Sequence, residues 1–490
     1  MSDSVLSRAD EVSDLLDSLQ KLIHPFIEAA DTSVTSLENG HRKPLVEHHE
    51  PQDLSRILKL DLPERGVGKE GLMNVVEMVL KYSVNTWDRG FMDKLYGATN
   101  AVGVASELLL SVLNTNVHVN TVSPTLTQIE KYTTRSLASL IGYTTPNRGG
   151  VSQPGGSASN LLSVILARNT LFPSTKTDGN GPHKFRLFVS KHSHYSLSKA
   201  AQILGLGSNA VISIPVDLSG RMLAASLQEA ITKSRERGET PLYICATAGT
   251  TVMGSYDPII PLSAIAKSEN LWLHIDGSWG GAVIFSPSLR ATRMLGVELA
   301  DSVAITPHKM LGVPVTCSFL LGPDLDIFHG ASSIEAGYLF HGNVGGGEIY
   351  DLADLTPQCG RKGDALKLFL GWTYYGTSGY ARQLENAFET AEYFYSLLDA
   401  DPRFVVVSEQ PLPCLQVCFY WAGKRGLSGD KVANGRITER IVNGLVGKGY
   451  MVDYAPGEMG KFFRVVVNRD TRRETVEGLV KAIEDVAGRI

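Results

Sequence analysis

Short apolar runs alternate with helical patterns through the middle of the chain, between about residues 98 and 366. The expected strands cover residues 187–189, 210–216, 242–246, 271–275 and 302–305. The expected helices cover residues 101–114, 126–141, 196–204, 223–237 and 262–268. Strands that are apolar throughout and separated by helices are typical of a parallel sheet covered on both faces, which binds ligands at the carboxyl ends of its strands. We therefore expect an α/β fold with a mostly parallel central sheet.

The flanking segments follow other patterns. Residues 5–31 carry apolar side chains at helical spacing, which predicts an amphipathic helix. Its apolar face needs a covering surface, and a second copy of the chain is the one that we expect. Residues 32–65 are polar and irregular. Helices are expected at 365–375 and 381–399, followed by interleaved strands and helices. The expected parts are an N-terminal helical dimerisation segment (1–97), a large domain (98–366) and a small C-terminal α+β domain (367–490).

Composition narrows the class of protein. Of the 490 residues, 43% are hydrophobic and 20% are charged, with a net charge of −5, so there is no basic excess to favour nucleic acid. No apolar run is long enough to span a bilayer, and the polar N-terminus is unlike a signal peptide. The five cysteines are scattered, and Cys414 and Cys418 have no second pair. We expect reduced thiols in a cytoplasmic protein that holds no metal.

A lysine stands between two apolar runs. Lys309 follows the expected strand 302–305 and precedes the run 313–321. Burial disfavours an ammonium group and lowers its pKa, and the neutral amine can then form a Schiff base with an aldehyde cofactor. The alternative is that Lys309 extends its ammonium group from a strand end into solvent.

Four other polar segments fall at strand ends or at a helix start: 154–160, 191–196, 246–251 and 274–281. In the first, two glycines and the hydroxyls of Ser157 and Ser159 precede a helix, a pattern that suits an anion. In the second, His194 can stack on a planar ring, and metal binding is disfavoured because no acidic or cysteine partner is near. Each segment taken alone is also explained as an ordinary turn or helix cap.

The spacing of these segments favours one ligand. Thr247, Asp276 and Lys309 are separated by about one strand–helix unit each, so a parallel sheet brings them to the same edge. An amine, an acid and a phosphate cradle on one edge suit pyridoxal 5′-phosphate (PLP), because the amine holds the aldehyde and the acid keeps the ring nitrogen protonated.

The same segments resemble a known family. Residues 154–160, 193–196, 246–251, 271–281, 307–310, 337–340, 358–361 and 462–464 are similar to motifs of the group II PLP-dependent amino-acid decarboxylases. The similarity is greatest to the glutamate, cysteine sulfinate and aspartate decarboxylase branch and covers nearly the whole chain. It implies an aspartate-aminotransferase-like (fold type I) architecture and a homodimer with active sites at the subunit interface.

The resemblance also implies roles for individual residues. Lys309 would carry the cofactor, Asp276 would pair with the ring nitrogen, and His194 would stack on the ring. Ser278 would lie near the other ring face, where the family usually has alanine, and Thr247 would lie beside the ring. The phosphate contacts would be Ala158, Ser159 and His308, and Thr306 replaces the usual asparagine.

Two further residues match substrate-handling positions of the family. Arg464 corresponds to the arginine that binds the substrate α-carboxylate, a task that suits a planar two-pronged donor. Tyr338 corresponds to a tyrosine on a loop that returns a proton to Cα, and this loop, 336–350, is rich in glycine.

The expected pocket for the substrate side chain departs from the family. Lys94 and Tyr96 lie in a stretch where the family usually has Phe-Asn-Gln-Leu, and His118 replaces an aromatic residue, whereas Asn116 is like the glutamate enzymes. A bulky Tyr96 would shorten the pocket, and Lys94 and His118 would add positive charge. We therefore expect aspartate or cysteine sulfinate rather than glutamate. The alternative is that Lys94 and His118 face solvent or that the substrate is neutral.

We therefore expect α-decarboxylation of a small acidic amino acid. One alternative keeps the cofactor but changes the outcome to aldehyde synthesis, transamination or carbon–carbon bond formation, because a fold does not fix a reaction. Another is a catalytically silent binding protein, which the intact Lys309, Asp276 and Arg464 disfavour. A serine hydrolase is disfavoured because the chain has no Gly-x-Ser-x-Gly elbow.

Overall fold

A seven-stranded sheet forms the centre of the molecule in the computed structural model, which describes residues 7–32, 42–334 and 349–490. Its strand order is β1-β7-β6-β5-β4-β2-β3. The strands are β1 (Gly149–Gln153), β2 (Phe185–Ser190), β3 (Val211–Ile214), β4 (Thr240–Thr247), β5 (Trp272–Gly277), β6 (Ser302–Ile305) and β7 (Ser318–Gly322). All neighbouring pairs among β2 to β6 are parallel. Strand β7 is antiparallel to both of its neighbours, β6 and β1. The expected mostly parallel sheet is therefore confirmed.

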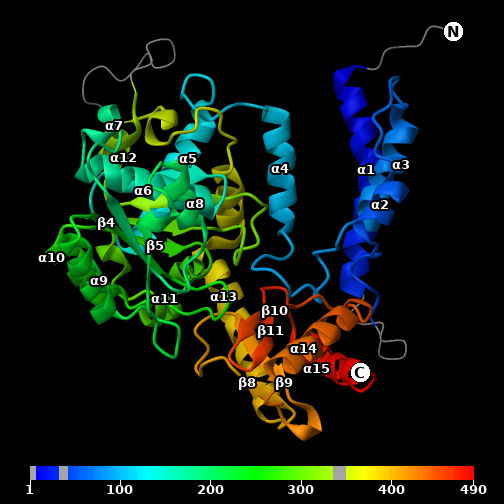
Figure 1. The fold of residues 1–490 in the computed structure, drawn as a ribbon. Helices are drawn as coiled ribbons and strands as arrows, with labels where there is room; N and C mark the ends of the chain where they lie inside the picture. Colours follow the sequence, from blue (N-terminus) through cyan, green and yellow to red (C-terminus); the bar gives the residue numbers. More distant parts are fainter. Residues whose placement is uncertain (1–6, 33–41, 335–348) are drawn as a thin grey trace.

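Helices bury both faces of this sheet (Figure 1). Those that contact its strands are α5 (Pro124–Ile141), α6 (Gly156–Leu171), α8 (Ser196–Ile203), α9 (Ala224–Glu236), α10 (Ile259–Glu269) and α12 (Leu325–Ser332). Helices α4 (Ala101–Leu113), α7 (Thr175–Asp178) and α11 (Pro287–Arg293) pack mainly on other helices. Along β5, Trp272 packs in the cluster that includes Leu162 of α6, whereas Leu273 and Ile275 pack in the cluster on the opposite face. Alternate side chains of one strand thus enter two cores, which explains why the strands are apolar throughout.

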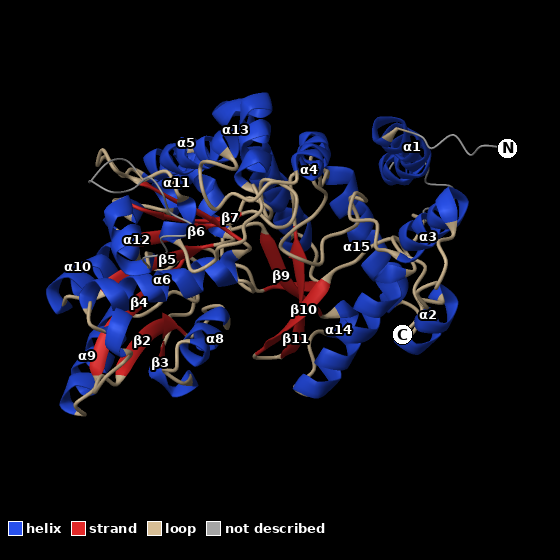
Figure 2. Ribbon diagram, turned by 90° about the horizontal axis from the view of Figure 1, so that it is seen from above, coloured by secondary structure: helices blue, strands red, loops and turns tan. Residues whose placement is uncertain are grey.

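A second sheet belongs to the C-terminal part of the chain. Its order is β10-β11-β9-β8, and all its pairs are antiparallel. Its elements are β8 (Phe404–Val406), β9 (Gln416–Trp421), α14 (Lys431–Val446), β10 (Asp453–Gly457), β11 (Gly460–Val466) and α15 (Arg473–Ala487). Figure 2 shows this small sheet beside the large one, with α14 and α15 on its outer side. The α+β pattern expected for the C-terminal region is present.

Three local differences from the sequence expectation have physical causes. The interval 32–65, expected to be irregular, contains α2 (Pro51–Leu58), whose first position is a proline with φ already suited to a helix. Strand β1 was not expected because it is short and begins with two glycines. The helices expected at 365–375 and 381–399 form one element, α13 (Ala365–Asp399), bent at Gly376. The expected domain boundary at residue 366 falls in its first turn.

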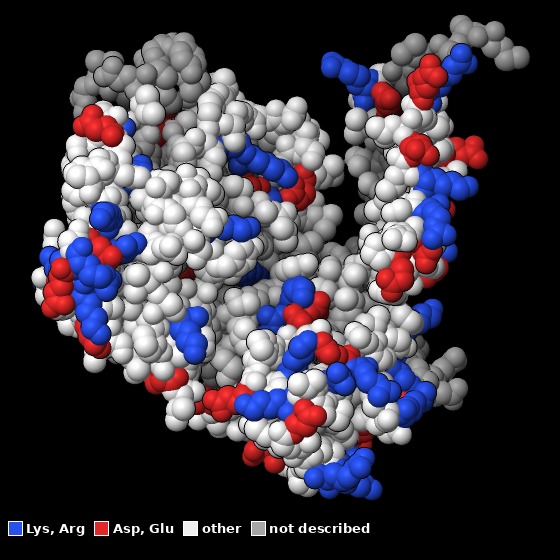
Figure 3. Space-filling view, viewed as in Figure 1, with Lys and Arg blue, Asp and Glu red and all other residues white. Residues whose placement is uncertain are grey.

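The N-terminal helices form an arm that stands apart from the large domain. Helices α1 (Arg8–Thr32) and α3 (Gly68–Tyr82) run side by side, and Lys69 pairs with Asp14 at 2.6 Å. The chain leaving the arm joins the small domain where Phe91 pairs with Met451. Figure 3 shows an open gap between the arm and the large domain. No helix of the described residues is long and apolar enough to cross a membrane.

Candidate active site

A cavity of about 290 Å³ opens at the carboxyl edge of the large sheet. Its walls come from the start of α6, the segment after β2, the ends of β4 and β5, and the turn after β6. Seven of the expected site residues line it: Ser157, His194, Thr247, Asp276, Ser278, His308 and Lys309. The parallel strands therefore bring the separated segments to one place, as their spacing predicts.

Lys309 lies in the turn after β6, where its backbone N–H donates to the carbonyl of Thr306 at 3.1 Å. Burial lowers the pKa of its ammonium group, and the charge of Asp276 partly opposes that shift. Among the described residues, no carboxylate lies close enough to Lys309 to form an ion pair. Its amine is thus more easily deprotonated than a solvent-exposed lysine.

Asp276 lies near the end of β5 and is buried. Its Oδ1 accepts from the Ser278 backbone N–H at 3.0 Å, and its Oδ2 accepts from the Asn160 side-chain amide at 2.8 Å. Burial acts to raise the pKa of this carboxyl, but the hydrogen bonds from Ser278 and Asn160 and the nearby Lys309 hold it below its ordinary value. Asp276 is therefore a fixed negative charge in a buried site.

His194 follows β2 and has a defined ring orientation. The backbone N–H of Ser196 donates to its Nδ1 at 3.2 Å, so Nδ1 is the acceptor and Nε2 carries the proton of the neutral ring. Burial lowers the pKa of His194, although the charge of Asp276 opposes the shift. The cavity is thus lined by a neutral, flat ring.

The start of α6 can hold an anion. The helix begins at Gly156, and its cap residue Gly155 (φ 105°) supplies no side-chain acceptor for the first N–H groups. A Cβ on Gly156 would lie 2.3 Å from the Ser278 hydroxyl oxygen, so only glycine fits there. His308 also faces this cavity, and burial lowers its pKa to about 4.

Three expected phosphate contacts have other neighbours. The hydroxyls of Ser159 and Thr306 both meet the Ser318 hydroxyl, at 3.0 and 2.9 Å, in a fully buried group behind the cavity. These hydroxyls join α6 to β7. Ala158 donates its backbone N–H to the Gly155 carbonyl at 3.0 Å. The structure thus does not place these three groups on the cavity wall.

Arg464 reaches the site from β11 of the small domain. Its Nη1 donates to the Thr251 carbonyl at 3.2 Å, and Thr251 lines the cavity. Its Nη2 donates to the Asp93 carbonyl at 2.7 Å and to Asp453 Oδ2 at 2.8 Å. Its Nε is buried and has no hydrogen-bond partner in the described structure. An arginine buried in this way has donor capacity left for a ligand.

The residues expected to contact the substrate side chain divide into two groups. Lys94 lies beside Arg464, because its Nζ donates to the same Asp453 oxygen at 3.0 Å. Tyr96 is 41% exposed and packs on Phe91. Asn116 and His118 lie elsewhere, at a different network around Arg361. The structure therefore brings Lys94 to Arg464, but within one chain Lys94, Tyr96, Asn116 and His118 all lie off the wall of the Lys309 cavity.

Known proteins resemble the chain along its whole length. The family model described as the pyridoxal-dependent decarboxylase conserved domain matches residues 51–422. L-aspartate decarboxylase dtxS4 of Metarhizium robertsii is 46% identical over 496 residues, covering 99% of each chain. Glutamate decarboxylase-like protein FG08083 of Gibberella zeae is 38% identical over 521 residues, again covering 99% of each. The solved structure of mouse CSAD superposes with a TM-score of 0.90 at 29% identity, covering 98% of this chain and 99% of that one.

The chain belongs to the pyridoxal-dependent decarboxylase family. The decarboxylase uses PLP and has the fold type I architecture that the sequence predicts. The described residues fit the cofactor. The hydroxyl oxygens of Thr247 and Ser278 are buried at the cavity without a hydrogen-bond partner, so a ligand there would satisfy them. The α6 start suits the phosphate, and Asp276 suits a protonated ring nitrogen.

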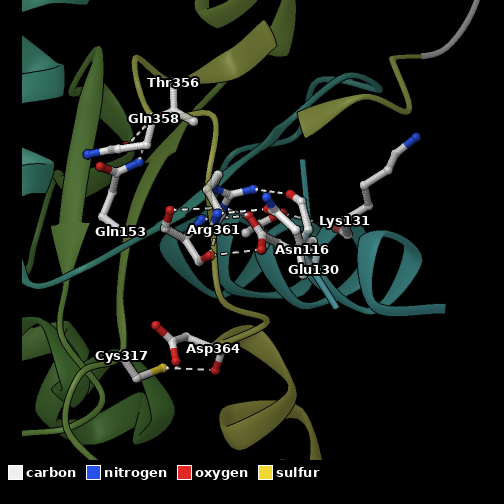
Figure 4. A network of polar contacts seen from close by, with 12 residues as sticks. Asn116, Glu130, Lys131, Gln153, Cys317, Thr356, Gln358, Arg361 and Asp364 are labelled. Atoms are coloured by element: carbon white, nitrogen blue, oxygen red, sulfur yellow. Dashed lines mark hydrogen bonds and ion pairs between the residues drawn. The ribbon is translucent and has the colours of Figure 1, made fainter. Parts of the chain in front are cut away.

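The decarboxylase holds Asn116 in a buried polar network (Figure 4). The Asn116 side chain accepts from the Arg361 backbone N–H at 2.8 Å, and the Arg361 guanidinium pairs with Glu130. Glu130 also accepts from the backbone N–H and the hydroxyl of Ser152, each at 2.8 Å. His118 is attached to the edge of this network through the Asn116 carbonyl at 3.1 Å. Asn116 therefore supports the fold around β1 through Arg361.

Sequence reasoning assigned no role to three residues that the structure places at the site. Asn160 donates to Asp276; it ends the segment 154–160, which was expected to bind an anion, but no role was expected for Asn160 itself. Asp453 bonds Arg464 and Lys94 across the β10–β11 pair. Asp257 accepts the backbone N–H groups of Thr247 at 2.8 Å and Met222 at 2.7 Å, and burial raises its pKa to about 6. The position of Asp257 ten residues after a strand end is the only sequence signal that could have pointed to it.

Proposed function

We propose that this decarboxylase removes the α-carboxylate of a short acidic L-amino acid, with L-aspartate as the preferred substrate. The observation that carries the proposal is the 46% identity, over 99% of both chains, to a protein named L-aspartate decarboxylase. The site supports it, because Arg464 and Lys94 lie together and can receive two carboxylates. Cysteine sulfinate carries a comparable acidic side chain and is the second choice.

The described residues have separate tasks in this proposal. Bound PLP supplies an electron sink that accepts the electron pair left when the carboxylate departs as CO₂. Lys309, whose pKa is lowered by burial, would hold the cofactor through its amine. Asp276 would offer its negative charge to the ring nitrogen. His194 offers its neutral ring as a stacking surface, and Thr247 and Ser278 offer their unpartnered hydroxyls.

Arg464 positions the carboxylate that leaves. It is 6% exposed and is held by two backbone carbonyls, so its guanidinium keeps its orientation when a substrate binds. Lys94 would pair with the substrate side chain. Although partial burial opposes it, pairing with Asp453 and Asp93 raises the pKa of Lys94, which therefore stays cationic. Because Arg464 and Lys94 both donate to the same Asp453 oxygen, the proposal favours a short diacid over glutamate.

The proton donor to Cα remains a proposal from the family resemblance. Tyr338 and most of its loop (residues 336–348 of 336–350) lie outside the described residues.

The substrate proposal is tested with purified enzyme, added PLP and a panel of L-aspartate, cysteine sulfinate, L-glutamate and L-tryptophan. CO₂ and amine are measured together. We expect equal CO₂ and amine, with the highest kcat/KM for L-aspartate. Turnover confined to tryptophan would overturn the pocket assignment. Aldehyde and ammonia in place of amine would establish the aldehyde-forming alternative, and absence of CO₂ with every substrate would favour the binding protein.

We also propose a homodimer. Helix α4 exposes five large apolar side chains at between 41% and 69% of their surface: Val104, Leu108, Leu109, Val112 and Leu113. Helix α3 of the arm exposes three more, Leu72, Val75 and Val79. A second copy packed against α4 and the arm would bury these side chains. Light scattering after size-exclusion chromatography should give twice the 53.1 kDa chain mass, and a fully active monomer would contradict the proposal.

A cytoplasmic location is the last part of the proposal. Five free cysteines support it, because four are buried thiols in a chain with no disulfide among the described residues. Figure 3 shows positive and negative side chains interspersed over the small domain, without a broad patch of one sign on that face. Fractionation of cells expressing the tagged protein should place it with cytosolic markers, and recovery with membranes or medium would contradict this.

A further inference from the structure

A row of buried polar side chains leads away from Asp276 beneath α6. Asp276 Oδ2 accepts from Asn160 Nδ2 at 2.8 Å, and Asn160 Oδ1 lies 3.0 Å from His274 Nε2. His274 Nδ1 lies 2.9 Å from the Ser302 hydroxyl, which also accepts from Trp272 Nε1 at 2.9 Å. All five residues are at most 5% exposed. The row is therefore shielded from water along its length.

The fold sets the row in place. Trp272, His274 and Asp276 occupy alternate positions of β5 and so face the same side of the sheet, where α6 supplies Asn160. Ser302 is the register partner of His274 on β6. The Tyr243 ring stacks on the His274 ring with 5.9 Å between centroids and 23° between planes, and the Tyr243 hydroxyl lies 2.7 Å from the Ser163 hydroxyl. The imidazole is thus packed in one orientation.

The donor and acceptor chemistry gives every bond in the row one direction. An ionised Asp276 can only accept, so Asn160 must turn its amide nitrogen to it. The Asn160 oxygen then faces His274 Nε2, which must carry a proton. Burial lowers the pKa of His274 to about 4, so the ring is neutral and Nδ1 is an acceptor.

The far end of the row agrees with this direction. Because Nδ1 of His274 accepts, the Ser302 hydroxyl must donate to it. The indole Nε1–H of Trp272 can only donate, and it donates to the Ser302 oxygen. Both ends therefore dictate the same tautomer and the same orientation of Asn160. If Asn160 and His274 served only to satisfy each other's hydrogen bonds, the row would not need to reach the Asp276 carboxylate at the cofactor cavity.

We propose that His274 and Asn160 are positioning residues that fix Asp276 as the ionised partner of the cofactor ring nitrogen. His274 prevents the Asn160 amide from turning over. If Asn160 turned, its carbonyl oxygen would face the Asp276 carboxylate and repel its charge. The inference rests on the role proposed above for Asp276, and it adds the two residues that keep the Asp276 carboxylate ionised and oriented.

The test uses the full-length protein, stripped of cofactor and reconstituted with PLP. His274→Phe fills the space but has no donor toward Asn160, whereas His274→Gln can still present an N–H there. Cofactor affinity is measured by titration, and the absorption spectrum of the reconstituted protein is recorded. We expect His274→Phe to bind PLP at least about ten-fold more weakly with a shifted visible band. We expect His274→Gln to stay within about three-fold of the wild type, with the wild-type spectrum.

Two further variants complete the test. Asn160→Asp, nearly isosteric, places a second carboxylate against Asp276 and should weaken PLP binding by at least as much as His274→Phe. Asp276→Asn is the reference for loss of the ring-nitrogen partner. Suppose that Asp276→Asn weakens PLP binding. If either His274→Phe or Asn160→Asp is folded and keeps the affinity and spectrum of the wild type, the row has no positioning role. If Asp276→Asn itself binds PLP like the wild type, the role proposed for Asp276 fails first.

Discussion

The carboxylate of Asp453 accepts a hydrogen bond from Arg464, with 2.8 Å between Oδ2 and Nη2, where β10 pairs with β11. The same oxygen accepts from Lys94 at 3.0 Å. One acidic side chain therefore holds the two cations that we assign to a diacid substrate. An incoming substrate carboxylate must compete with Asp453 for both of them.

Replacing Asp453 with asparagine should tighten substrate binding. Arg464 keeps its bonds to the carbonyls of Thr251 and Asp93, so its position survives while a competing negative charge is lost. Because the pair is partly exposed, we expect KM for L-aspartate to fall about two- to five-fold. Steady-state kinetics at two salt concentrations measure this.

Glu439→Gln is the matched control for that prediction. It removes the same unit of charge from the small domain, but Glu439 pairs with Lys461 and does not contact Arg464. Its KM should equal that of the wild type. A higher KM in Asp453→Asn would show instead that Asp453 aligns Arg464 for the substrate.

Stability should depend on pH through His308. Burial lowers its pKa to about 4 from an ordinary value of 6.5, so the unfolded chain binds more protons than the folded one between these values. The resulting stability is complete above about pH 6.5 and is lost as the pH falls toward 4. The full effect is on the order of 3 kcal/mol.

The measurement is urea unfolding of the protein without cofactor, because a phosphate beside His308 would stabilise the charged ring. His308→Gln should show a smaller decrease in unfolding free energy between pH 6.5 and 4.5 than the wild type. Equal decreases in the two proteins would mean that His308 titrates normally.

The ion pair between Arg361 and Glu130 should be essential for stability. The two side chains are 5% and 0% exposed, and Glu130 also receives two hydrogen bonds from Ser152. Arg361→Met would leave a buried carboxylate without its cation, at a cost of about 3–5 kcal/mol in unfolding free energy. Denaturant titration measures the loss. Adding Glu130→Gln should restore part of the stability, and an additive further loss would contradict coupling between the two residues.

Reduction with borohydride should attach PLP to Lys309. Mass spectrometry of a digest should find the modification on the peptide that contains Lys309, and Lys309→Ala should lose it together with activity. Lys367 is the internal control, since it is also buried but pairs with Asp364 at 2.8 Å and with Glu107 at 2.6 Å, and these contacts raise its pKa. Labelling of the Lys367 peptide would contradict our assignment of the anchor.

The sequence predicted the meeting of Lys309, Asp276 and Thr247 because parallel strands end at one edge of the sheet, whatever the details of packing. It did not predict that Asn160 contacts His274, because that contact depends on which side of α6 faces β5, 114 residues later in the chain. The role of Asp453 follows from a cross-strand register that no local pattern encodes. Ser159 and Thr306 were expected at the phosphate, but both hydroxyls are occupied by Ser318, a residue in a third element.

The most direct test of the proposed function follows the carbon that leaves. Purified enzyme with PLP is given L-aspartate labelled at C1 or, separately, at C4, and labelled CO₂ and the amino-acid product are measured. We predict labelled CO₂ from the C1 substrate only, with β-alanine as the product, because Arg464 positions the α-carboxylate for departure. Labelled CO₂ from C4 with alanine as the product, or no CO₂ from either substrate, would contradict the proposed function.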